Sequence, residues 1–170
     1  MNTVTQPLRA EHQELLPHIE QIRQVAEKIG ETAASEILES VNEVYDFLAY
    51  HLKPHAQAEE AALYPVVQKV LGSPAATRTM SRDHVEIGRY IEELEALRKK
   101  LFNKELEGTE IRDLQRVLYG VYALIKVHFA KEEEVYLPFL DQNLTPASAQ
   151  EMFARMEAAA HQAKDAVHIH

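Results

Sequence analysis

The chain has 170 residues, of which 46% are apolar and 26% charged, with a net charge of −9 and no cysteine. These values are ordinary for one globular domain, so we expect residues 1–170 to form a single domain. The lack of cysteine excludes disulfides, thiolate-held zinc or iron–sulfur sites and thiol catalysis. The acidic charge, with no dense Lys/Arg run, argues against a nucleic-acid-binding surface.

The chain also lacks the features of a membrane or secreted protein. No apolar run is long enough to cross a membrane. The first residues, Met1 to Leu8, have neither the charged start nor the apolar stretch of a signal peptide. We therefore expect a cytoplasmic protein with no membrane or nucleic-acid partner, present as a monomer or a homodimer.

The composition predicts an all-α protein, because Ala, Glu and Leu are frequent and only 5 glycines occur. Apolar residues recur with helical spacing in four long segments and one shorter one, which we place at 5–29, 32–70, 75–102, 109–140 and 146–164. Short connections make consecutive helices antiparallel neighbours. The prediction is an up-down antiparallel four-helix bundle over about 5–140 with an additional C-terminal helix.

The first two predicted helices have recognisable ends and interruptions. The first should begin with Thr5 as N-cap and end at Gly30. The second contains Pro54 and Pro65, each of which should bend or interrupt it, because proline removes a backbone donor.

The later helices are delimited in the same way. The third should end at Phe102, and Pro138 should bend the end of the fourth. We expect a turn at 141–143 and a frayed tail at 168–170.

One polar pattern occurs twice along the chain, at offsets of 72 and 73 residues. Each half carries a lone histidine and then a His-x-x-x-Glu, in which the two side chains point the same way from a helix. All these residues fall in line with the apolar residues of the predicted core faces. They are His12, His55 and Glu59 in the first half and His84, His128 and Glu132 in the second.

Their chemistry predicts a metal centre. Burying an unpaired carboxylate is unfavourable, and a multivalent cation removes that penalty while binding the imidazoles. Histidine and carboxylate are ligands for iron, manganese and zinc alike. Six such ligands, two of them able to bridge, suit two ions better than one. A ferritin-like site is disfavoured, because no histidine has Glu three residues before it.

Each part of the pattern has a simpler explanation when taken alone. A single core-facing histidine is more often a hydrogen-bonded structural residue, and a single His-x-x-x-Glu usually lies on a solvated face. The simplest alternative is therefore a helical bundle in which these residues are incidental. The joint occurrence on four predicted core faces favours the metal centre.

The motifs resemble the hemerythrin family, specifically the HHE cation-binding domain, over about residues 5–140. The segments that carry the resemblance are the two His-x-x-x-Glu motifs, His51-Leu-Lys-Pro-His55 and Leu63-Tyr64-Pro65. The resemblance implies a four-helix bundle around two non-haem iron ions, bridged by two carboxylates and an oxo or hydroxo group. It implies as ligands His12, His55, Glu59, His84, His128 and Glu132.

The chain departs from the oxygen-carrying hemerythrins at two points. They have a second histidine one turn after the third-helix histidine, where this chain has Gly88, and they end in His-x-x-x-x-Asp rather than His128-x-x-x-Glu132. Reversible O2 carriage is therefore not expected. A missing histidine should leave an open position at which peroxide, O2 or NO reacts.

Several residues keep alternative interpretations. His51 lies one turn before His55, so it is a candidate further ligand or catalytic acid/base beside bound peroxide; alternatively, Pro54 moves it to the rim. Glu60 and Glu133 either lie on a solvated face or hydrogen-bond a ligand imidazole. The tyrosines either pack or meet the metal.

The functional hypothesis is a di-iron protein that decomposes hydrogen peroxide, as a catalase does, or has a related role in oxidative or nitrosative stress. The alternative is an iron or oxygen sensor or an iron-binding module without turnover. In that case the last helix could contact a partner through Met152, Phe153 and Met156, unless these residues cover the core of the bundle itself.

Overall fold

The structure, a computed structural model, describes residues 3–101 and 108–167. Their regular structure is entirely helical, as predicted. The α-helices are α1 (Gln6–Lys28), α2 (Ala34–Phe47), α3 (Lys53–Ala58), α4 (Tyr64–Leu71), α5 (Arg78–Leu101), α6 (Gly108–Lys131), α7 (Leu137–Asn143) and α8 (Pro146–Val167). Three π-helical turns join some of them, namely η1 (Leu48–Leu52), η2 (Glu59–Leu63) and η3 (Glu132–Tyr136).

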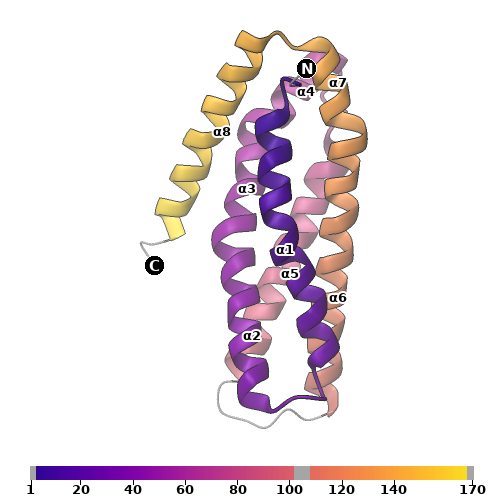
Figure 1. The fold of residues 1–170 in the computed structure, drawn as a ribbon, viewed down its shortest axis with the longest axis vertical. Helices are drawn as coiled ribbons and strands as arrows, with labels where there is room; N and C mark the ends of the chain where they lie inside the picture. Colours follow the sequence, from indigo (N-terminus) through magenta and orange to yellow (C-terminus); the bar gives the residue numbers. More distant parts are fainter. Residues whose placement is uncertain (1–2, 102–107, 168–170) are drawn as a thin grey trace.

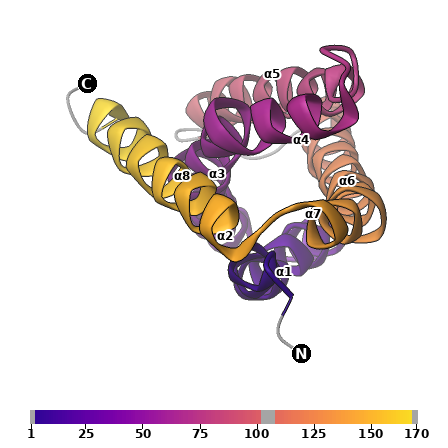
Figure 2. The same cartoon turned by 90° about the horizontal axis from the view of Figure 1, so that it is seen from above.

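The helices form the predicted up-down bundle of four rods (Figure 1). The rods are α1, the continuous run from α2 to α4, α5, and the run from α6 to α7. In the view along the bundle they surround a common interior (Figure 2), with α1 against α2 and α6, and α5 against α2 and α6. The remaining helix, α8, packs outside the bundle on α3 and η2, and its C-terminal half diverges from it.

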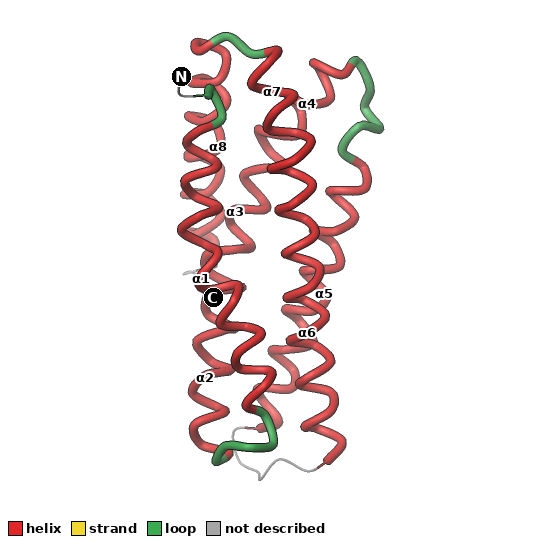
Figure 3. The backbone as a smooth tube through the Cα atoms, turned by 45° about the vertical axis from the view of Figure 1, so that its right-hand side comes forward, coloured by secondary structure: helices red, strands yellow, loops and turns green. Residues whose placement is uncertain are grey.

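Three of the prolines inside the rods follow π-helical turns, whereas Pro17 lies within α1 without one. Pro54, Pro65 and Pro138 each lie at the start of an α-helix directly after such a turn. A proline cannot donate to the carbonyl one turn back and its ring collides with it. In the π turn before Pro54 the N–H of Lys53 bonds the carbonyl of Leu48, five residues back, which widens the helix where the ring must fit. The rods therefore continue past the prolines (Figure 3). Glu59 and Glu132 are the first residues of two of these turns.

The helix ends largely follow the expected signals. Gly30 and Gly72 adopt left-handed φ angles of 90° and 65° after α1 and α4, a conformation that glycine allows without strain. Thr5 is the N-cap of α1, but its hydroxyl donates to Asp141 Oδ1 at 2.8 Å instead of to its own helix.

Four predicted boundaries differ from the structure or lie outside the described residues. The turn expected at 141–143 is part of α7, and α8 continues beyond 164 to Val167. The helix end at Phe102 and the frayed tail at 168–170 lie outside the described residues. Among the helices described, none combines the length and apolar character needed to cross a membrane.

Two apolar clusters fill the bundle, one on each side of a polar layer. The larger lies between α1, α2, α5 and α6 and contains Ile22, Val41 and Leu118, all fully buried. The second cluster contains Leu63 and Tyr64. It lies at the end of the bundle where the chain begins, and it includes residues of α8. Along each rod, the predicted metal ligands fall between these clusters.

The C-terminal helix covers the bundle's own core, because Met152 and Met156 are buried beside Leu8 and Ala58. We expect Met152→Ala to lower the free energy of unfolding by about 2–5 kcal/mol, the usual effect of deleting a buried methionine side chain. Urea unfolding measures it, with the exposed Gln162→Ala as control. Equal stability of the two variants would contradict the packing of α8 on the bundle.

Candidate metal centre

All six predicted ligands meet in the interior of the bundle. Each rod contributes at least one: His12 from α1, His55 and Glu59 from α3 and η2, His84 from α5, and His128 and Glu132 from α6 and η3. Five of them are buried and His84 is partly buried. The helical rods thus place residues far apart in sequence at one level of the bundle.

The ligand atoms form two groups that share Glu59. In the first, His12, His55, Glu59 and Glu132 each offer an atom, and these atoms all lie within 4.8 Å of one another. In the second, Glu59, His84 and His128 do the same. Each group has the size and donor set of a single cation site, so the arrangement fits two ions.

The two carboxylates lie between the groups. Glu59 Oε1 is 2.9 Å from His55 Nε2, and its Oε2 is 3.2 Å from His84 Nε2. Glu132 Oε2 is 3.4 Å from His12 Nε2, and its Oε1 is 3.5 Å from His128 Nε2. Glu59 thus directs one oxygen to each group, as a bridging ligand would, whereas Glu132 belongs to the first group and its Oε1 accepts a hydrogen bond from Tyr64.

Buried polar atoms without hydrogen bonds test whether these residues fit a metal. Among the described residues these atoms include Nε2 of His12 and His55, both oxygens of Glu59 and Oε2 of Glu132. A buried polar atom without a partner lowers stability by about 1–3 kcal/mol. Such a concentration in one place is exceptional in a folded protein, and bound cations would satisfy all these atoms together.

A second layer of carboxylates holds the four imidazoles in place. Each ring directs Nε2 inward and donates from Nδ1 to an acidic residue. The pairs are His12–Glu133 at 2.7 Å, His55–Glu11 at 2.9 Å, His84–Glu60 at 2.7 Å and His128–Asp83 at 3.1 Å. Such pairs fix the tautomer and orientation of a metal-binding histidine and strengthen its ligand nitrogen.

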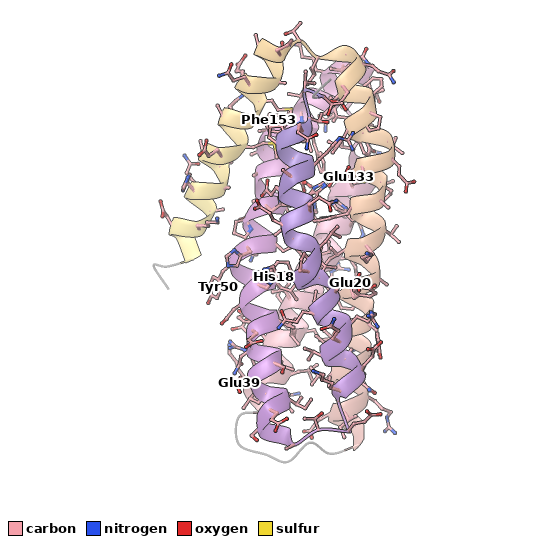
Figure 4. The ribbon with its side chains drawn as sticks, viewed as in Figure 1. His18, Glu20, Glu39, Tyr50, Glu133 and Phe153 are labelled. Atoms are coloured by element: carbon pink, nitrogen blue, oxygen red, sulfur yellow. The ribbon has the colours of Figure 1, made fainter. Side chains whose placement is uncertain are left out.

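This layer is itself paired with cations and hydroxyls. Arg9 forms an ion pair with Glu133, and Lys131 forms one with Asp83. Glu133, labelled in Figure 4, lies between α1 and the α6–α7 rod. Ser81 donates to Glu60 at 2.9 Å. These contacts hold the outer carboxylates, and through them the imidazole rings, in place.

The sequence pattern is compatible with either role for Glu60 and Glu133, and it did not indicate a role for Glu11 or Asp83. A signal for the missed pair was present, since Glu11 directly precedes His12 and Asp83 directly precedes His84. Each acidic residue, however, bonds the histidine of a neighbouring rod and not the one beside it. These contacts therefore depend on how the rods pack.

Tyr64 is the tyrosine that reaches the site. It is buried, and its hydroxyl donates to Glu132 Oε1 at 3.0 Å. The Tyr64 hydroxyl oxygen is also 3.4 Å from His128 Nε2 and 3.5 Å from His84 Nε2. Burial, together with the charges of Glu59 and Glu132, raises the pKa of the Tyr64 phenol far above its usual range. Tyr64 thus adds a polar oxygen to the second group.

His51 is not brought to the cluster. Its side chain is exposed and its ring stacks on Phe47, with 6.4 Å between ring centroids. It lines a hollow on the outer surface together with His18 and Tyr50. His18 and Tyr50 are labelled in Figure 4. The position agrees with the alternative that His51 sits at the rim, and it does not support the predicted catalytic role beside the metal.

The buried groups carry opposite charges in the metal-free protein. Burial disfavours the His128 imidazolium, but hydrogen bonds and charges from Glu132 and Glu59 outweigh this and raise its pKa to about 10. Burial likewise disfavours the Glu59 carboxylate, yet His55, His12 and His128 lower its pKa well below the usual value. Imidazolium–carboxylate pairs thus partly replace the cations.

We expect metal-free protein to be most stable between about pH 4.5 and 6.5, the unfolded-state pKa values of Glu and His. The His128 contribution is complete below 6.5 and is lost as pH rises toward 10. The Glu59 contribution is complete above 4.5 and is lost as the solution becomes more acidic. Urea unfolding of chelator-treated protein from pH 4 to 9 measures this. A free energy of unfolding that increases from pH 6 to 9 would refute it.

Comparison with known proteins agrees with this geometry. The model of the hemerythrin HHE cation binding domain matches residues 3–140. This segment contains all six residues of the two groups and ends before α8. No match is found among curated proteins or among solved structures.

Proposed function

This chain belongs to the hemerythrin HHE cation-binding domain family, and we propose that it holds two iron ions in its bundle and decomposes hydrogen peroxide with them. The observation that carries the proposal is the pair of ligand groups sharing Glu59 in a buried layer. Iron is chosen because of the family, since the same ligands suit manganese and zinc.

The residues divide between two sites in this proposal. One ion is held by His12, His55, Glu59 and Glu132, and the other by Glu59, His84 and His128, with the Tyr64 hydroxyl beside it. When bound, two iron ions alternating between ferrous and ferric states supply the two electrons that peroxide disproportionation exchanges.

The protein's own groups exclude water and manage protons. The apolar clusters above and below the polar layer keep bulk water out. The raised pKa keeps Tyr64 protonated in the metal-free site, so Oη holds a proton beside Glu132 and both histidines of the second group. His84 is the least buried of the six residues, so a small molecule enters most directly from its side.

Oxygen release from hydrogen peroxide tests the proposal. We expect iron-loaded protein to release O2 faster than the same amount of free iron, and His55→Ala and His128→Ala each to abolish the excess by disrupting one group. The exposed His161→Ala is the matched control and should behave as the wild type. Release no faster than free iron would eliminate peroxide decomposition while leaving metal binding intact.

A second candidate is an iron or oxygen sensor, or an iron-binding module without turnover. It is favoured by the contribution of all four rods to the site, since loading would then tie the whole bundle together. A large gain in stability on loading, with no peroxide turnover, would select it. For either function, a cytoplasmic location, and a monomer or homodimer, remain predictions.

A further inference from the structure

A cavity lies beside the second ligand group, between the α3–η2 segment and α5. Its volume is about 390 Å³. The walls are mainly apolar, formed by Ala56, Ala61, Ile87, Gly88 and Ile91, and the polar residues Lys53, Gln57, Glu60 and His84 complete the lining. It is separate from the surface hollow around His51.

Small residues on both sides create this space. A Cβ atom placed on Gly88 would meet no heavy atom within 4 Å. The facing segment carries Ala56 and Ala61 instead of large side chains. The Cβ of a larger residue at 88 would therefore displace no neighbour, and the rest of its side chain would take up space in the cavity that Gly88 lines.

His84 connects the cavity to the metal centre. Its side chain is 9% exposed, its Nδ1 bonds Glu60, and its Nε2 lies 3.2 Å from Glu59 Oε2. A molecule in the cavity therefore contacts an imidazole whose inner nitrogen belongs to the second group.

The size and chemistry of the cavity define its ligand. A cavity of about 150 Å³ holds benzene, so by the same scale this one holds roughly ten to fifteen non-hydrogen atoms. Hydrogen peroxide alone would not fill it. Glu60, which bonds His84, can also accept a hydrogen bond from a ligand hydroxyl, and Lys53 and Gln57 are the other polar residues of the lining. With one cation and one anion in the lining, a neutral head group requires no net countercharge.

We propose that this cavity binds a small aromatic or branched aliphatic molecule with a single hydroxyl or hydroperoxyl group, held with that group toward His84 and Glu60. This inference rests on the proposed function in one respect. If the metal centre reacts with peroxides, the ligands that reach it through this cavity are organic hydroperoxides and the alcohols formed from them. Gly88 is the residue that determines whether such a ligand fits.

The test uses 2-phenyl-2-propanol, the unreactive alcohol of an aryl hydroperoxide, titrated into metal-loaded full-length protein by calorimetry. We expect saturable binding to the wild type and to Gly88→Ala, and binding at least ten-fold weaker in Gly88→Leu. Ala61→Leu, which fills the cavity from the opposite side, should show the same loss. Ala96→Leu, an exposed change elsewhere on α5, is the matched control and should bind normally.

No saturable binding to the wild type would overturn the inference, as would wild-type affinity in both Gly88→Leu and Ala61→Leu. Metal content and circular dichroism of each variant show that the site and fold persist. Because the readout is binding of an alcohol, it is independent of oxygen release from hydrogen peroxide. The cavity and the peroxide reaction can therefore fail separately.

Discussion

Glu59→Gln is expected to remove both metal ions from the protein, since Glu59 is the one residue that belongs to both ligand groups. The amide keeps the size of the side chain but is a much weaker ligand and cannot bridge two cations as a carboxylate does. Metal analysis after loading and gel filtration should fall from about two ions per chain to nearly none.

The contrast with single-group variants makes this prediction specific. His55→Ala touches only the first group and His128→Ala only the second, so the direct loss in each is one ion. Glu39→Gln, an exposed carboxylate on α2 at the far end of the bundle (Figure 4), should leave both ions bound. If Glu59→Gln retained one ion, Glu59 would not be the shared ligand.

Metal loading is expected to raise the melting temperature by roughly 15–30 °C. Each ion present at about 1,000 times its Kd adds about 4 kcal/mol, and a domain of this size gains about 2–4 °C per kcal/mol. The physical cause is that bound cations satisfy the buried atoms of Glu59, Glu132, His12 and His55 that lack hydrogen bonds.

Differential scanning calorimetry with and without chelator measures this shift near pH 7. Glu59→Gln is the matched control, because its melting temperature should hardly respond to metal. A wild-type shift of only a few degrees would show that the imidazolium–carboxylate pairs stabilise the layer nearly as well as cations do. The chain would then not depend on metal for its fold.

Helical periodicity accounts for the part of this protein that sequence predicted. A rod of period 3.6 directs residues four apart to one side, so placing His55 and Glu59 on a core face required only their spacing from neighbouring apolar residues. The repeat then predicted that His128 and Glu132 would meet them, and in the structure these side chains lie in the same buried layer.

Proline positions predicted interruptions but not their form. Bends were expected at Pro54 and Pro65, whereas the chain inserts π turns and keeps each rod continuous. Proline chemistry is compatible with either outcome, so the local sequence did not distinguish them. The exposure of His51, which lies in η1, was likewise decided only in the folded bundle.

The sequence by itself determined the helical class and the identity of the six convergent residues, because both follow from spacing within single rods. Only the tertiary structure decided that Glu11 and Asp83 hold His55 and His128, that Tyr64 enters the second group, and that Gly88 borders a cavity. Each of these contacts joins different rods. Their distances depend on how the rods are rotated and spaced, which no local pattern specifies.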